Sequence, residues 1–260
     1  MTLWVRFKAA DARIGFGVLE GDQILEYDGD MFGEHTPSGK SHSHAAVRLL
    51  SPCTPSKIIA LWNNFHALAL KLEKPAPKYP LFLIKPASCL GGPHDAIERP
   101  VSYQGKIVYE GELGVVIGKT CANVSVEAAP KYIFGYTCVN DITAVELLYE
   151  DPNFPQWCRA KSYDTFGCVG PSIATGLDWW TLRVVTKLDA VERQNFPLSD
   201  MIFSPYELVS LLSHDMSLLP GDLISCGTSI GVGSMKGGAS VEIQIDGIGN
   251  LKNSMATARH

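Results

Sequence analysis

The sequence predicts a strand-rich α+β domain with few helices and a small N-terminal portion. Short apolar runs bounded by glycines and prolines recur along the whole chain, and such runs are typical of β-strands. Only a few segments have apolar residues at helical spacing, and they do not alternate with strands as in a β-α-β chain. The length of 260 residues suits one large domain, or one domain with a small appendage.

Residues 1–51 are expected to form the small N-terminal portion, and residues 52–260 the main domain. Strands are predicted in TLWVRF, RIGFGVLE and DQILEYDG, joined by glycine and aspartate turns. The polar stretch FGEHTPSGKSHSH indicates a loop, in which His42 and His44 have no acidic partner nearby and make only a weak metal site. The two prolines of SPCTPSKIIALW mark the border near residue 52.

The main domain continues with strands and two predicted helices. HALALKLEK favours a helix, and the Asn-Asn pair just before it suits an N-cap. The clearest helix is SPYELVSLLSHD, where Ser204 can cap, Pro205 suits the first turn, and Leu208, Leu211 and Leu212 form an apolar stripe. The remaining predicted strands are PLFLIKP, KIVYEGELGVVIG, YIFGYTCVND, LRVVTKLDAV, LPGDLISCGTS and ASVEIQIDGIGNLKN.

Composition excludes several classes of function. A net charge of -5 without any Lys/Arg cluster argues against a nucleic-acid-binding surface. The apolar stretches are far shorter than the roughly 20 residues of a membrane span, and the N-terminus lacks the apolar segment of a signal peptide. The seven cysteines have no C-x-x-C spacing, which is typical of reduced, buried thiols. We therefore expect a cytoplasmic protein.

Two glutamates, Glu110 and Glu112, interrupt an apolar run in YEGELGVVIG. Residues two apart in a strand project from the same face, so their like charges repel. A solvated outer strand face would explain the pair, but the following LGVVIG is apolar on both faces and favours a buried strand. Buried carboxylates need a partner or a cation, and Mg²⁺ or Mn²⁺ prefers such oxygen ligands.

Further charged residues accompany this pair. Asp141 ends the apolar run of YTCVND and is a candidate third carboxylate, although Asn-Asp is also an ordinary turn dipeptide. Arg159 and Lys161 supply two cations in RAKSYD, unless they are surface charges. GTSIGVGSMKGG lacks the G-K-[ST] ending of a phosphate-binding loop, which excludes that motif.

The order of these blocks resembles the fumarylacetoacetate hydrolase superfamily, and in particular its bacterial members of aromatic catabolism. The matching blocks are YEGELGVVIG, FGYTCVNDIT, RAKSYDTFGCVGPSIAT, DMIFSPYELVSLLS and LLPGDLISCGTSIGVG, and the resemblance runs from about Lys57 to Lys252. It implies a mixed β-sheet roll with few helices, assembled as a homodimer or higher homo-oligomer.

The resemblance also implies a set of site residues. Glu110, Glu112 and Asp141 would bind one Mg²⁺ or Mn²⁺ ion, and Lys161 would contact the substrate and its enolate. Three further residues are expected to contact a small-molecule oxo-acid substrate, namely Thr228 of the G-T-x-x-G-V-G loop, Arg159 and Asn64.

The chain departs from the family pattern at two positions. Hydrolytic members activate water with a histidine four residues after the asparagine of N-Y-x-x-H, partnered by a glutamate. Counting from Asn64 reaches Leu68; His66 is out of register, with Glu73 further along the predicted helix. The arginine of the family's T-A-R-D stretch, which contacts a substrate carboxylate, is replaced by Val145 in TAVE.

These residues lead to an expected function with two alternatives. We expect a divalent-metal-dependent enzyme that acts on a 2-oxo acid or 1,3-dicarbonyl compound of aromatic catabolism through an enolate, with isomerisation or decarboxylation favoured. The first alternative is a C–C bond hydrolase of the acylpyruvate or fumarylacetoacetate type, with His66 as the water-activating base. The second is a catalytically inactive binding protein of the same fold.

Overall fold

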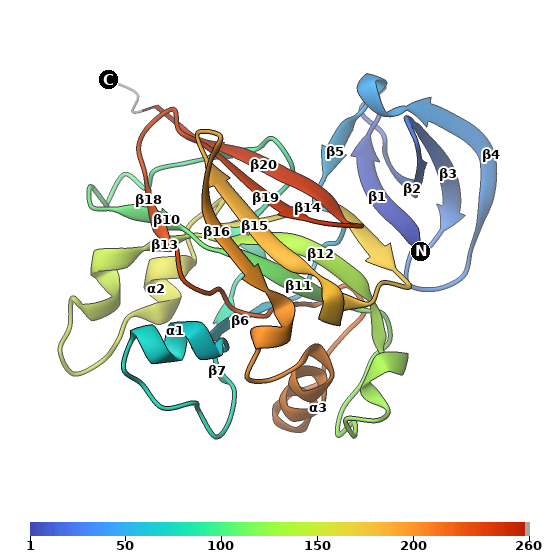
Figure 1. Cartoon of the computed structure of the whole chain (residues 1–260). Coiled ribbons are helices and arrows are strands. Elements are labelled where there is room, and N and C mark those ends of the chain that lie inside the picture. Colours follow the sequence, from blue (N-terminus) through green and yellow to red (C-terminus); the bar gives the residue numbers. More distant parts are fainter. Residues whose placement is uncertain (258–260) are drawn as a thin grey trace.

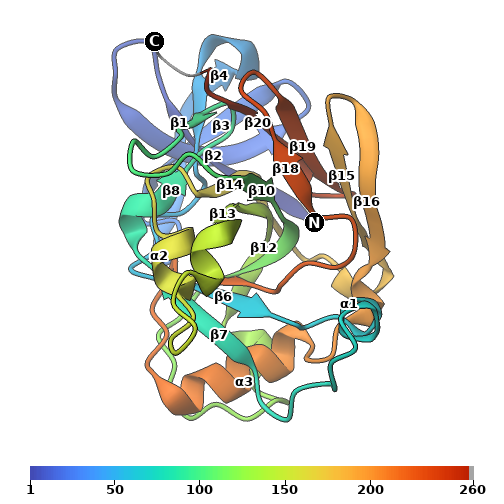
Figure 2. The same cartoon turned by 90° about the vertical axis from the view of Figure 1, so that its left-hand side faces the viewer.

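The computed structural model describes residues 1–257, where twenty strands pair into three sheets and three α-helices lie around them (Figure 1). The expected strand-rich α+β class with a mixed sheet is therefore confirmed. In two views at right angles, the helices lie on the side of the molecule away from β1–β4 (Figure 2). Within the described residues, none of the helices is long and apolar enough to cross a membrane.

The largest sheet has twelve strands. Ten follow the order β4-β3-β2-β1-β14-β12-β11-β17-β6-β7, while β5 pairs with β1 and β8 with β14. The bounds are β1 (Thr2–Lys8), β2 (Ile14–Glu20), β3 (Gln23–Gly29), β4 (His35–Ser43), β5 (Arg48–Leu50), β6 (Ile58–Trp62), β7 (Leu81–Lys85), β8 (Leu90–Gly91), β11 (Gly111–Ile117), β12 (Ile133–Asp141), β14 (Gly167–Thr175) and β17 (Leu223–Ser225).

Two smaller sheets and the helices complete the fold. The three-stranded sheet has the order β13 (Thr143–Ala144), β10 (Ile107–Tyr109) and β18 (Gly233–Met235). The five-stranded sheet has the order β16 (Val191–Pro197), β15 (Arg183–Leu188), β19 (Ser240–Ile245), β20 (Gly249–Met255) and β9 (Ala96–Ile97). The α-helices are α1 (His66–Lys71), α2 (Trp157–Lys161) and α3 (Pro205–Asp215). Short 3₁₀ helices span His44–Ala46, Ala87–Cys89, Ala129–Lys131, Val145–Tyr149, Trp179–Thr181 and Leu198–Asp200.

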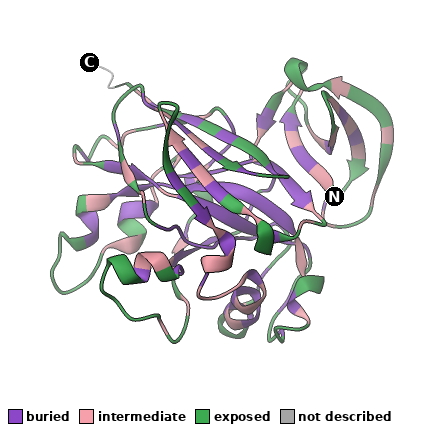
Figure 3. Ribbon diagram, viewed as in Figure 1, coloured by how far each residue is buried: buried purple, intermediate pink, exposed green. Residues whose placement is uncertain are grey.

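Strands β11 and β12 form the buried centre of the largest sheet (Figure 3). All seven residues of β11 are buried, as the apolar run on both its faces predicts. The antiparallel register places Gly111 opposite Asn140 and Glu112 opposite Val139. The carboxylate-bearing end of β11 therefore lies beside the end of β12.

The predicted strand KIVYEGELGVVIG is two strands rather than one. β10 ends at Tyr109 and β11 begins at Gly111, and the two strands belong to different sheets. Glu110 lies in the break between them. Its backbone N–H is consequently free to bond a side chain, Asn140 Oδ1, at 3.2 Å.

The N-terminal strands extend the largest sheet. β1 pairs antiparallel with β14, with Thr2 opposite Thr175. The prediction of a loop in FGEHTPSGKSHSH is wrong, because strand β4 occupies most of this stretch and pairs with β3. A polar sequence can form this strand because it lies at the sheet edge, where ladder hydrogen bonds need no buried side chains.

The expectation that His42 has no acidic partner is also wrong. Its Nε2 atom lies 2.6 Å from Glu26 Oε2, on the neighbouring strand. Glu26 also binds Arg13 through contacts of 2.5 and 3.1 Å. The side chain of Glu26 is only 2% exposed, so this acid is a buried centre of charge in the N-terminal strands.

Replacing Glu26 with glutamine should destabilise the protein at neutral pH. Hydrogen bonds from Arg13 outweigh the cost of burial and, with help from His42, lower the pKa of Glu26 from 4.5 to about 2. A depressed pKa contributes stability above pH 4.5 that is lost as the pH falls toward 2. We expect E26Q to lower the free energy of unfolding by about 2 kcal/mol at pH 7, discounted because Arg13 is partly exposed. Urea unfolding at pH 7 and pH 3 checks this; an equal loss at both pH values would contradict it.

The helix predictions are partly confirmed. Ser204 caps α3 and forms a capping box with Glu207, and Pro205 occupies the first turn. The N-cap of α1 is Phe65 rather than an asparagine, because the Asn64 side chain bonds residues outside the helix. α1 ends at Lys71, so Glu73 lies beyond the helix, with a left-handed φ of 53°.

The cysteines agree with the expected reduced state. All seven are free in the structure; six are buried and Cys158 is exposed.

Candidate metal centre

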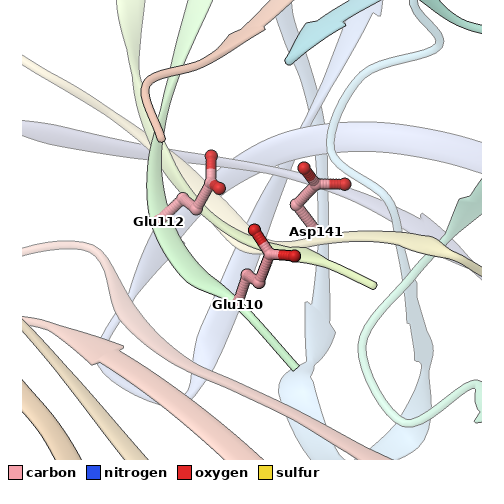
Figure 4. Close-up of side chains that lie close together, drawn as sticks. All are labelled: Glu110, Glu112 and Asp141. Carbon is pink, nitrogen blue, oxygen red and sulfur yellow. The ribbon is translucent and has the colours of Figure 1, made fainter. Parts of the chain in front are cut away.

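Three carboxylates converge at the ends of β11 and β12 (Figure 4). One ligand oxygen from each of Glu110, Glu112 and Asp141 lies within 4.8 Å of the others. The antiparallel register brings the strand ends together, and Asp141 N–H donates to the Glu110 carbonyl at 2.9 Å. Glu112 and Asp141 are buried, whereas the Glu110 side chain is 17% exposed. Glu110 is therefore the member of the group that solvent can reach.

Gly111 allows the two glutamates to meet at this point. A Cβ atom at this position would lie 2.0 Å from Thr186 Oγ1, which real atoms cannot do. The close approach of β15 to this segment therefore requires glycine between Glu110 and Glu112.

Two buried lysines reach the carboxylates from other elements. Lys161, at the end of α2, donates to Asp141 Oδ2 at 2.7 Å and to Glu110 Oε1 at 2.9 Å. Lys85, at the end of β7, forms an ion pair with Asp141 and donates to the Phe166 carbonyl at 2.8 Å. The three carboxylates and two ammonium groups together carry one formal negative charge.

These contacts shift the pKa values of the charged groups. Burial opposes the charged form of Lys161, but Asp141, Glu110 and Glu112 outweigh it and raise the pKa of Lys161 above its usual range. Burial likewise opposes the charge on Asp141, but Lys161 and Lys85 prevail and lower the pKa of Asp141. Both groups are therefore charged at neutral pH.

Glu112 is the unbalanced member of the group. Its Oε2 atom accepts from Ser225 Oγ at 2.5 Å and from Gly227 N–H at 2.8 Å. Its Oε1 atom is buried without a hydrogen-bond partner among the described residues. Burial, followed by the charges of Asp141 and Glu110, raises the pKa of Glu112 well above its usual range.

This arrangement fits a divalent cation. A buried carboxylate oxygen without a donor is costly unless a cation binds it, and two more carboxylates lie next to it. Mg²⁺ and Mn²⁺ prefer ligand sets made of oxygen atoms. Glu110, Glu112 and Asp141 can therefore hold such an ion, as the resemblance implies.

Thr228 lies next to the glutamates, but its hydroxyl group is engaged within the protein. Thr228 Oγ1 donates to the Gly111 carbonyl at 2.9 Å and accepts from Gln194 Nε2 at 2.9 Å. In this arrangement the hydroxyl hydrogen of Thr228 is not free for a substrate, although the side chain lies close to the group.

Three other candidate residues are not joined to the carboxylates. His66 is exposed at the start of α1, and no side-chain hydrogen bond of His66 is found in residues 1–257. Asn64 is buried and bonds main-chain groups of Phe203 and Cys226. Arg159 is exposed and forms an ion pair with an exposed acid, Glu150. The structure therefore gives Asn64 and Arg159 contacts that serve the fold and the surface.

The sequence reasoning missed four residues around the carboxylate group, three of which contact a carboxylate directly. Thr143 donates to Glu110 Oε1 at 2.5 Å. Lys85 and Ser225 make the contacts given above, and Gln194 is linked to the group only through Thr228 and the Gly111 backbone. Lys85 offers a signal in retrospect, because it is a lone charge that ends the apolar strand LFLIK. Ser225, Thr143 and Gln194 are ordinary polar residues whose contacts only the folded chain reveals.

A mixed β-sheet roll with a buried group of three carboxylates defines a class of proteins able to hold a divalent metal. Within that class, a family model described as fumarylacetoacetate (FAA) hydrolase C-terminal matches residues 57–256. A second model, described as Rv2993c-like, N-terminal, matches residues 3–52. The chain belongs to the fumarylacetoacetate hydrolase family, and the resemblance drawn from its sequence is confirmed.

Three of the similar proteins carry the names of enzymes. The chain is 36% identical over 228 residues to the oxaloacetate tautomerase YisK of Bacillus subtilis (strain 168), covering 82% of this chain and 75% of that protein. The 2-hydroxyhepta-2,4-diene-1,7-dioate isomerase of Mycobacterium marinum is 34% identical, with a TM-score of 0.91 and 100% of both chains covered. The maleylpyruvate hydrolase of Sphingobium sp. SYK-6, solved with manganese(II) and pyruvate, is 28% identical, with a TM-score of 0.79 and 100% of both chains covered. Together they support a metal-dependent, enolate-type activity in general.

Proposed function

We propose that the protein is a Mg²⁺- or Mn²⁺-dependent tautomerase that interconverts the keto and enol forms of a small 2-oxo acid. We further propose that it works in the cytoplasm as a homodimer or higher homo-oligomer, which sedimentation velocity would check. The observation that carries the proposal is the composition of the carboxylate group. In the part of the chain that the structure describes, its hydrogen-bonded neighbours include two lysines and no histidine.

Tautomerisation suits this composition because it needs no attacking water. In the keto-to-enol direction, one proton passes from the carbon next to the 2-oxo group to solvent, and one proton from solvent is added to the 2-oxo oxygen, so that the step balances. No carbon–carbon bond breaks, and no water molecule is consumed. A hydrolase instead needs a general base within hydrogen-bond reach of a water molecule.

The chain supplies a positive charge beside the carboxylates. Lys161 keeps its proton on Nζ, because its raised pKa leaves it an ammonium group at neutral pH. It therefore acts as a hydrogen-bond donor to negative charge and not as a base. A divalent ion held by Glu110, Glu112 and Asp141 would supply further stabilisation of negative charge on a substrate oxygen. The buried position of Lys161 strengthens its interaction with an anion, since water screens it little.

The substrate class follows from the residues and from the relatives. Val145 stands where many family members have an arginine, so recognition of a second carboxylate must come from another residue or be weaker. The oxaloacetate tautomerase YisK supports a small 2-oxo acid as the first substrate to test. The ring-cleavage compounds of aromatic catabolism come next, as the name of the M. marinum isomerase suggests.

The experiment compares tautomerisation with C–C hydrolysis in the wild type and in His66→Ala. We expect metal-dependent enol–keto conversion of oxaloacetate, which is measured as the loss of enol absorbance. We expect no cleavage of an acylpyruvate. H66A should change the tautomerase rate by less than about twofold, because His66 does not contact the carboxylate group. H214A, which removes an exposed histidine of α3, is the matched control.

Two results would replace the proposal. Acylpyruvate cleavage by the wild type that H66A abolishes and H214A retains would make the protein a hydrolase with His66 as its base. Metal-dependent binding of oxalate without turnover of any of these compounds would make it a binding protein.

A further inference from the structure

Gln194 is a buried amide outside the set of charged residues that make up the candidate metal centre. It lies in β16 of the five-stranded sheet and is only 1% exposed. Its side chain crosses from that sheet to the segment of Gly111 and to the loop that follows β17. Gln194 thus touches two parts of the chain that carry the candidate site.

The contacts of Gln194 form a closed ring of hydrogen bonds. Gly111 N–H donates to Gln194 Oε1 at 3.0 Å. Gln194 Nε2 donates to Thr228 Oγ1 at 2.9 Å, and Thr228 Oγ1 donates to the Gly111 carbonyl at 2.9 Å. Both peptide groups that flank the Gly111 Cα atom are therefore held by side chains.

Gly111 is the only residue between Glu110 and Glu112, so its peptide groups set the directions in which the two glutamates leave the backbone. Glycine has no Cβ atom and little intrinsic preference for one conformation. The pairing with β12 holds this segment through the Glu110 carbonyl, which accepts from Asp141 N–H, whereas the N–H and carbonyl of Gly111 itself bond to side chains. The ring supplies those bonds on both sides of the Gly111 Cα atom.

The end of β17 and the loop that follows it also hold Glu112 directly. Ser225 Oγ and Gly227 N–H both donate to Glu112 Oε2. Gln194 Nε2 makes a longer contact of 3.3 Å to the Ser229 carbonyl, which fastens the loop further along. The loop 225–229 and the glutamate segment thus form one hydrogen-bonded unit, with Gln194 as the link from the neighbouring sheet.

We propose that Gln194 is a positioning residue that, through Gly111 and Thr228, holds Glu110 and Glu112 at the spacing needed to bind the divalent ion. The inference rests on the metal site of the proposed function. Residues that hydrogen-bond to metal ligands and orient them, without binding the metal, weaken metal affinity by about 10- to 100-fold when they are replaced. Gln194 would act in this way without touching the ion or the substrate.

The test is a titration of the folded protein with Mn²⁺, in which electron paramagnetic resonance measures the free ion and gives the Kd. The variant is Gln194→Met. Methionine keeps the volume of the side chain and removes the two hydrogen bonds that Gln194 contributes to the ring. We expect the Kd for Mn²⁺ to rise about tenfold or more. Thr228→Val breaks the same ring from the other side and should raise the Kd as well. The double variant should bind only slightly more weakly than either single one, because both changes open one ring.

Asn253→Leu provides the matched control for a merely structural effect. Asn253 is another buried amide, and it donates to the carbonyls of Gly92 and Asp95 at 3.0 and 2.9 Å. N253L should lower the melting temperature as Q194M does, yet leave the Kd for Mn²⁺ unchanged. Circular dichroism confirms that each variant is folded at the titration temperature.

The outcomes separate the inference from the function on which it rests. Wild-type Kd values in Q194M, or in T228V should Q194M fail to fold, would overturn the positioning role and leave the metal site intact. An equal rise of the Kd in N253L would also overturn it, because any buried amide would then have the same effect. A wild-type protein that binds no Mn²⁺ would overturn the metal site itself.

Discussion

Replacing Glu112 with glutamine is expected to abolish Mn²⁺ binding and turnover while raising the melting temperature of the metal-free protein. The first effect follows because Glu112 Oε1, which has no hydrogen-bond partner among the described residues, is the proposed ligand atom, and an amide group lacks the negative charge that a divalent ion requires. The second follows because glutamine removes a buried charge that Asp141 and Glu110 repel. A carboxamide can still accept from Ser225 and Gly227, so the fold of the loop should survive.

The rise in stability should depend on pH. Burial and neighbouring charges raise the folded-state pKa of Glu112 above the ordinary 4.5. In metal-free wild-type protein this carboxyl therefore lowers stability as the pH rises above 4.5, whereas below 4.5 it is neutral in both the folded and the unfolded state. The advantage of E112Q should accordingly grow as the pH rises from 4.5 toward neutrality. Each kcal/mol of this advantage should appear as a rise of roughly 2–4 °C in melting temperature.

Differential scanning fluorimetry with EDTA and with Mn²⁺ measures both effects. Wild-type protein should gain stability with metal, by about 2.7 kcal/mol at a concentration of 100 Kd, and E112Q should gain none. Glu242→Gln is the matched control, because Glu242 is a carboxylate of β19 that pairs with Lys252 away from the site. A metal-induced shift in E112Q equal to that of the wild type would remove Glu112 from the metal site.

Most of the strand content could be predicted from the sequence because apolar side chains that alternate or run continuously need a sheet to cover them. β11 and β12 are examples, since their burial follows directly from their residues. β4 could not be found in this way. Its pairing with β3 uses backbone groups, so a polar edge strand such as β4 has no apolar periodicity in its sequence from which it could be predicted.

The carboxylates of the site were the predictable part for a related reason. Charges inside an apolar strand are conspicuous, because burial makes them costly, and Glu110, Glu112 and Asp141 all stand in such runs. Gln194 and Ser225 gave no such signal, since a neutral polar residue is common in any strand. The contacts of Asn64 and Arg159 were equally hidden, because they depend on which distant residue, Phe203 or Glu150, the fold brings beside them.

Replacing Lys161 with methionine is expected to lower kcat by about 10²- to 10³-fold without weakening Mn²⁺ binding. The loss in rate is the usual effect of removing one donor that faces developing negative charge. The Mn²⁺ affinity should stay equal or increase, because Glu110 and Asp141 lose a competing cation that binds them at 2.9 and 2.7 Å. This sign is opposite to that expected for E112Q, so the two variants distinguish the proposed metal ligand from the proposed substrate-facing charge.

The same variant should be less stable than the wild type when metal is absent. Breaking a buried ion pair leaves uncompensated charge and costs about 3–5 kcal/mol in general. In K161M, Glu110 loses its ammonium partner and Asp141 keeps only the ion pair with Lys85. Added Mn²⁺ should recover much of this loss, since the ion replaces the missing positive charge between the carboxylates. Lys252→Met, which removes an exposed lysine, controls for the change of side chain. If K161M instead bound Mn²⁺ more weakly and kept the wild-type kcat once saturated with metal, Lys161 would be a support for the ligands, and the donor to the substrate would have to be sought elsewhere.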